Sequence, residues 1–134
     1  MGGFRMHTGC VRKILIIDGS AGWKNRLKEI LHKNFPSCGT RVANDVRHAQ
    51  GEIQSYDPDG VIVEGESCLS LLKTMGGMEA RPTLVHGSRE VIFENGEEID
   101  LSKIMKIFPL ASFHLKHMGE AETYVSAWIE AYVL

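Results

Sequence analysis

Four side chains that can carry charge or move a proton stand at or near the ends of short apolar runs in this 134-residue chain. Asp18 and Glu64 each close such a run, Ser88 follows a third, and Lys116 ends a fourth. Two carboxylates, a hydroxyl and an amine suit phosphoryl transfer, because a carboxylate can attack phosphorus and positive charge can neutralise the phosphoryl oxygens. These groups can meet only if the four runs are neighbouring strands.

The elements that must position these groups follow from the spacing of apolar residues. Lys13–Asp18, Val61–Val63 and Thr83–Val85 are short apolar runs, typical of strands covered on both faces. Thr40–Ala43 predicts a more polar strand near an edge, and Ser112–Lys116 predicts the last strand. Helical patterns lie between the strands and are expected to begin near these residues: Ser20, Asn44 or Asp45, Cys68 and Ala121.

Strand and helix alternate five times, which indicates a parallel sheet with helices on both faces. We therefore predict a doubly wound α/β fold with five parallel strands. One domain is expected over residues 13–134, after a flexible N-terminal extension over 1–12. In such sheets the site lies outside the carboxyl ends of the strands. The candidate site residues are those expected there: Asp18, Gly19, Glu64, Gly87, Ser88 and Lys116.

Two further segments carry specific expectations. Residues Val91–Ile99 suggest a small hairpin around Asn95-Gly96, after which Asp100 or Ser102 could cap a short helix. The last helix has the strongest apolar stripe in the chain. We expect that stripe to be mostly core, with any protruding edge serving as an interaction surface, and its members are Ala121, Tyr124, Val125, Trp128, Ile129 and Tyr132.

Composition and charge exclude several classes of protein. Hydrophobic residues make up 43% of the chain and charged residues 24%, close to the average for soluble globular domains. Fifteen basic and seventeen acidic residues give a formal charge of −2, and without a basic stripe direct nucleic-acid binding is disfavoured. No apolar run is long enough for a membrane span and no secretory signal is visible, so a cytoplasmic protein is expected. The three widely spaced cysteines are expected to be reduced.

Residues 13–134 resemble the receiver domain of response regulators, the phosphoacceptor module of two-component signalling and phosphorelays. Four motifs carry the resemblance in the expected order: KILIIDGS, YDPDGVIVEGE, PTLVHGS and FHLKHMGEAE. The resemblance implies a flavodoxin-like or CheY-like fold, with a remodelled region where 89–111 exceeds the usual length. It also assigns positions in this chain: the acidic corner at Asp18 and Gly19, the phosphoacceptor at Glu64, the switch residue at Gly87 or Ser88, and the lysine at Lys116.

The departures from the family pattern fall on those same positions. An active receiver has a second acid where this chain has Gly19, and an aspartate where it has Glu64. Its hydroxyl residue stands at the place of Gly87, one before Ser88, and His117 replaces the proline expected after the lysine. Loss of one acid removes an oxygen ligand from a Mg²⁺ site that needs near-octahedral geometry. The extra methylene of glutamate displaces the nucleophile, and a displacement of about 1 Å can cost about 100-fold in rate.

We therefore predict a pseudo-receiver, an atypical receiver-like domain that is not phosphorylated on an aspartate and works by protein–protein interaction. It is expected to be no enzyme and to need no cofactor. Its expected partners are other signalling proteins or an output domain, a homodimer is a further option, and no membrane partner is expected. A salt bridge between Glu64 and Lys116 would imitate part of the phosphorylated state, although with less charge than a phosphate.

Two alternatives stay open. In the first, the domain is a receiver that still binds a metal such as Mg²⁺, or phosphate, weakly through Asp18 and Glu64. In the second, it is a small α/β nucleotide-binding module or enzyme that uses Gly19–Gly22 as a phosphate cradle, because backbone amides between a strand and a helix attract anions. That loop lacks the glycine and lysine spacings of the common phosphate-binding motifs.

Overall fold

The computed structural model describes residues 12–64, 81–87, 91–94, 97–100, 111–115 and 120–134. Its main sheet has five parallel strands in the order β2-β1-β3-β4-β7. These strands are β1 (Lys13–Ile17), β2 (Gly39–Ala43), β3 (Gly60–Glu64), β4 (Thr83–Gly87) and β7 (Ala111–Leu115). The helices are α1 (Ala21–Asn34), α2 (Val46–Tyr56) and α5 (Ala121–Trp128), which continues into the π-helical turn η3 (Ile129–Val133).

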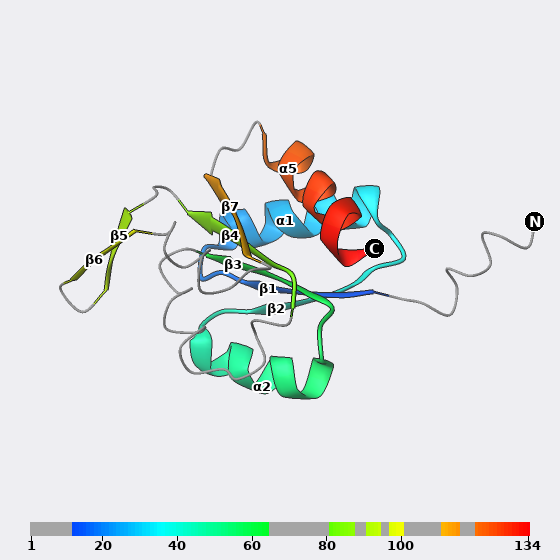
Figure 1. Cartoon of the computed structure of the whole chain (residues 1–134). Coiled ribbons are helices and arrows are strands. Elements are labelled where there is room, and N and C mark those ends of the chain that lie inside the picture. Colours follow the sequence, from blue (N-terminus) through cyan, green and yellow to red (C-terminus); the bar gives the residue numbers. More distant parts are fainter. Residues whose placement is uncertain (1–11, 65–80, 88–90, 95–96, 101–110, 116–119) are drawn as a thin grey trace, which may run out of the picture.

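Helices cover both faces of this sheet. Figure 1 shows α1 and α5 on one face and α2 on the other. The predicted doubly wound α/β fold is confirmed, as is the position of the polar strand β2 at an edge of the sheet. The predicted helix around Cys68 lies outside the described residues. So does the predicted N-terminal extension over residues 1–12, except for its last residue.

The central strands are apolar on both faces because each face meets a helix. The core on the α1 and α5 side includes Ile14, Ile16, Ile62 and Leu84 from the strands. Their alternate neighbours, such as Leu15 and Val61, are also fully buried. Successive strand side chains point to opposite faces, so an unbroken apolar run marks a strand with two covered faces.

The first two helices begin where the sequence predicts. The Ser20 hydroxyl caps α1 by accepting from the Trp23 backbone N–H at 3.5 Å, and the helix ends before Pro36. Asp45 caps α2, accepting from the backbone N–H of His48 at 2.8 Å. These caps fix the chain just after β1 and β2, at the carboxyl edge of the sheet.

The last helix corrects one expectation. Trp128 is buried as predicted, but Tyr124 and Tyr132 are 48% and 52% exposed. For Tyr132 the reason lies in η3, where the backbone N–H of Leu134 donates to the carbonyl of Ile129 at 3.0 Å, five residues back. This wider turn holds more residues than an α-helical turn. It leaves Val133 on the buried side after Ile129, and Tyr132 at the solvent edge.

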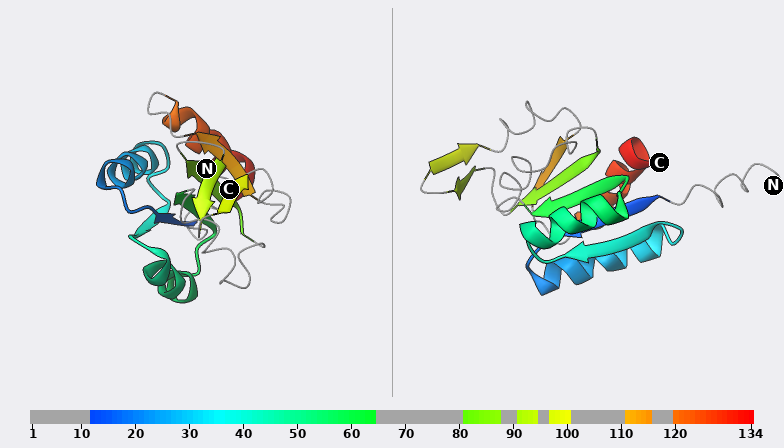
Figure 2. Two further views of the ribbon diagram at one scale, coloured as in Figure 1. Left: turned by 90° about the vertical axis from the view of Figure 1, so that its left-hand side faces the viewer. Right: turned by 90° about the horizontal axis from the view of Figure 1, so that it is seen from below.

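Between β4 and β7 the chain forms a separate antiparallel hairpin of β5 (Val91–Glu94) and β6 (Glu97–Asp100). This confirms the predicted hairpin and the remodelled region. Figures 1 and 2 show the hairpin standing apart from the main sheet, beyond its carboxyl edge. Asp100 is the last residue of β6, and the helix predicted after it lies outside the described residues. Among the described residues, no helix combines the length and the apolar character that a membrane span needs.

Candidate functional site

Polar side chains of three neighbouring strands meet at the carboxyl edge of the sheet. Asp18, Glu64 and His86 each stand two residues after a strand residue of the core that faces α1 and α5. Because strand side chains alternate between faces, all three belong to that face. The pairing of β3 with β4 puts Glu64 directly beside His86. The edge therefore places two acids and an imidazole in one row.

Asp18 is tied into the backbone on two sides. Its N–H donates to the carbonyl of Ala43 at 3.1 Å, which extends the β1–β2 pairing by one residue. Its Oδ1 accepts from the backbone N–H of Ser20 at 2.7 Å, a turn that aspartate favours. The same turn sets Ser20 in place to cap α1. Asp18 is only 1% exposed, so its carboxylate needs partners within the protein.

His86 supplies a partner that the sequence did not reveal. Its Nε2 lies 3.1 Å from Oδ2 of Asp18, and both side chains are almost completely buried. The two groups are in ion-pair contact, but the direction of the ring N–H misses the geometry of a good hydrogen bond. The ring of Trp23 packs on His86, with centroids 5.6 Å apart and planes at 52°. The only signal in the sequence was a histidine at the end of an apolar strand.

The other predicted site residues divide into two groups. Glu64 is the last residue of β3 and half-buried, Gly19 follows Asp18 at the surface, and Gly87 ends β4. Ser88 and Lys116 lie outside the described residues, and the Glu64–Lys116 salt bridge therefore stays a prediction. The structure thus brings Asp18 and Glu64 to one edge, as the strand order requires.

The receiver resemblance implies a Mg²⁺ ion at this edge, and the donor atoms of the described residues do not fit one. Magnesium takes about six oxygen ligands in near-octahedral geometry. Gly19 offers no side-chain oxygen, while Oδ1 of Asp18 accepts from a backbone amide and Oδ2 faces the imidazole. The part of the chain that the structure describes holds no group of three or more His, Cys, Asp or Glu side chains arranged for a metal ion.

Two backbone amides at the start of α1 that a phosphate cradle could use already have partners within the protein. The amide of Ser20 donates to Asp18, and the amide of Trp23 donates to the Ser20 hydroxyl. A buried carboxylate beside the loop also repels an anion. These contacts weigh against the nucleotide-binding alternative, which needed free amides at this position.

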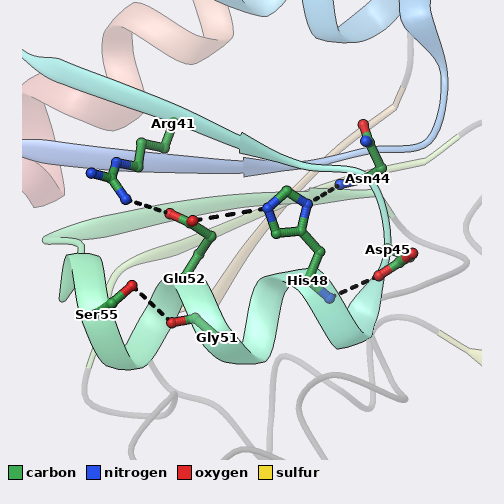
Figure 3. Close-up of polar contacts among 7 residues, drawn as sticks. All are labelled: Arg41, Asn44, Asp45, His48, Gly51, Glu52 and Ser55. Atoms are coloured by element: carbon green, nitrogen blue, oxygen red, sulfur yellow. Dashed lines mark hydrogen bonds and ion pairs between the residues drawn. The ribbon is translucent and has the colours of Figure 1, made fainter.

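A second polar cluster lies on the opposite face, between β2 and α2 (Figure 3). Glu52 forms ion pairs with Arg41 at 3.0 Å and with His48 at 3.8 Å. Nδ1 of His48 accepts a hydrogen bond from the backbone N–H of Asn44 at 3.4 Å. The backbone N–H of His48 donates to the Asp45 side chain. These mostly exposed contacts fasten α2 to the edge strand and give the cluster a structural role.

The amino end of the sheet holds the one cysteine that the structure describes, Cys38, which is a free thiol as expected. Burial, followed by the negative charge of Asp59, raises the pKa of this thiol. A raised pKa lowers the thiolate fraction at neutral pH, so Cys38 is a poor nucleophile. Chemistry at this end is therefore not favoured.

Comparison with known proteins agrees with this architecture. No protein-family model and no curated protein matches the chain. The response regulator domain of Thermotoga maritima CheB is similar in structure, with a TM-score of 0.66, 18% identity, and coverage of 92% of this chain and 96% of that one. A two-component response regulator from Clostridium difficile has a TM-score of 0.64 at 21% identity, covering 89% and 96%.

The phosphorylated cyanobacterial phytochrome response regulator RcpA is a third similar structure, with a TM-score of 0.64. It is 14% identical, and the match covers 91% of this chain and 94% of that one. Identities this low speak for the fold and not for the activity. The strand order, the helices on both faces and these similarities together show that the chain has the CheY-like receiver fold of two-component response regulators.

Proposed function

We propose that this chain is a receiver-like signalling domain that is not phosphorylated on an aspartate and that acts by binding other proteins. One observation carries the proposal. At the carboxyl edge, Gly19 and Glu64 stand where the receiver resemblance requires the second acid and the nucleophilic aspartate. The domain has no catalytic role in this proposal, and its partner is another signalling protein, an attached output domain or a second copy of the chain.

The chemistry of phosphoryl transfer explains why those two positions matter. The attacking carboxylate must lie in line with the bond that breaks, and cations must neutralise the oxygens of the transferred group. Glu64 has one methylene more than aspartate on a strand whose backbone is fixed by pairing on both sides. Gly19 brings no carboxylate to hold a cation. In-line attack by the carboxylate and neutralisation by a bound cation are therefore both weakened.

The test is to treat the protein with acetyl phosphate and MgCl₂. Intact mass reports whether a phosphoryl group has been added, and release of that group by hydroxylamine identifies it as an acyl phosphate. We expect no phosphoryl group on the wild-type chain, while an active receiver in a parallel reaction is labelled. Stoichiometric labelling of the wild type would falsify the proposal.

A matched variant, Gly19→Asp with Glu64→Asp, asks whether those positions are the cause. A Cβ is tolerated at position 19, because among the described residues it meets only the carbonyl oxygen of Asn44, at 3.5 Å. Labelling of this variant alone would place the defect at the two substituted residues.

A further inference from the structure

The contact between Asp18 and His86 is built into the core at the polar edge. Both side chains are about 1% exposed, so neither can exchange its partner for bulk water without local opening. A buried carboxylate without a compensating partner is costly. Nε2 of His86, 3.1 Å from Oδ2, is such a partner.

His86 is also held where it is by its surroundings. Its strand pairs with β3 on one side and with β7 on the other, and Glu64 is its neighbour in register. The ring of Trp23, from the first turns of α1, packs against the imidazole. Nδ1 of His86 is buried and has no hydrogen-bond partner among the described residues. Burial and the Trp23 ring therefore fix the imidazole beside Asp18.

We propose that His86 is the resident partner of the Asp18 carboxylate and excludes divalent cations from this edge of the sheet. Oδ1 already accepts from the Ser20 amide, so Oδ2, the oxygen that faces His86, has more lone-pair capacity to offer a cation. Magnesium prefers oxygen ligands to an imidazole nitrogen, so the ring beside Oδ2 is a poor substitute for a carboxylate or water ligand. The inference deepens the proposed function and rests on it, because it names a residue that keeps the edge free of the cation.

The test compares Mn²⁺ and Mg²⁺ binding by the wild type and by His86→Leu, at one fixed pH. Leucine puts an apolar side chain of similar size against Trp23 and removes the imidazole from Oδ2 of Asp18. A contact to a charged group is worth a factor of about ten or more in an equilibrium constant. We therefore expect Mn²⁺ to bind His86→Leu at least about tenfold more tightly than the wild type, and to raise the unfolding midpoint of that variant only.

Two controls locate the cation. Adding Asp18→Asn to His86→Leu should abolish the gain in affinity, because it removes the charge that attracts the ion. Mn²⁺ is paramagnetic and quenches nearby indoles, so emission of His86→Leu should fall with Mn²⁺, and Trp23→Phe should remove that response. Trp128 lies at the other end of the sheet, beside Gly60, and should not respond.

Should His86→Leu fail to fold, His86→Val carries the test, since valine suits a strand and likewise offers Asp18 no hydrogen-bond donor. Equal Mn²⁺ affinity of the wild type and of the folded His86 variant overturns the inference. So does micromolar Mn²⁺ binding by the wild type, or a gain that survives Asp18→Asn. Each of these results leaves the proposed function standing, whereas labelling of the wild type by acetyl phosphate removes the proposed function itself.

Discussion

The two ends of the same sheet are stabilised in different ways. At the amino end, Gly60 lies so close to Val133, Trp128 and Ile14 that a Cβ there would meet their side chains at 2.9, 3.1 and 3.3 Å. At the carboxyl end, the corresponding face holds the buried side chains of Asp18 and His86, whose Oδ2 and Nε2 lie 3.1 Å apart. One end gains stability from close apolar packing, and the other accepts buried polar groups that contribute specificity more than stability.

The largest effect should come from Trp128, which fills the amino end and is 4% exposed. We expect Trp128→Ala to lower the free energy of unfolding by about 3–5 kcal/mol, because the substitution leaves a cavity in the core. Chemical denaturation measures this directly. Tyr132→Ala is the matched control on the same turn, and its effect should stay within about 0.5 kcal/mol because Tyr132 is exposed. Similar losses for both variants would contradict the burial pattern of η3.

Gly60 should come next. Gly60→Ala inserts a methyl group where three side chains already touch, and we expect a loss of about 1–3 kcal/mol in the free energy of unfolding. Gly51→Ala is the control, since a Cβ at that exposed position of α2 meets nothing within 4 Å. It should raise stability by about 0.5–1 kcal/mol, as alanine does in place of glycine inside a helix. Equal effects of the two substitutions would show that packing at Gly60 is looser than described.

The smallest effect should come from the exposed contacts of Glu122 with the end of α1. Hydrogen bonds from Asn34 and then Lys33 lower the pKa of Glu122 below its ordinary value of 4.5. Because the folded pKa is lowered, Glu122 contributes stability that is fully present above its unfolded pKa and is lost as pH falls through the folded pKa. Glu122→Gln should therefore reduce the drop in unfolding midpoint between neutral pH and about pH 3. An unchanged drop would mean that the three side chains are not paired in solution.

The sequence predicted most of the fold because its strands are buried on both faces. Such strands stand out as unbroken apolar runs, and Ser20 and Asp45 marked the helix starts with side chains suited to capping. The exposure of Tyr132 could not be predicted, since the stripe was counted at α-helical spacing and η3 changes the spacing. Tyr124 lies in α5, before this change, and the spacing does not explain its exposure. Tyrosine also tolerates the solvent edge, where its hydroxyl reaches water.

The candidate site was predicted only in part. Asp18 and Glu64 could be placed at one edge because parallel strands end together. His86 could not be predicted as their neighbour, because its position looked like the last residue of a strand and nothing nearby in sequence pairs with it. The contact spans β1 to β4, with β3 between them, and exists only after the strands take their order.

The amino end has one more consequence, for anything joined to this domain. β1 starts there at Lys13, and Val133 packs against Gly60 one residue before the chain's last residue. The start of β1 and the C-terminal end of η3 therefore both lie toward the amino edge of the sheet, opposite the edge that holds Asp18 and His86. Figure 1 shows β1 and the C-terminus. A reporter fused after Leu134 would therefore start at the opposite edge of the sheet from Asp18 and His86.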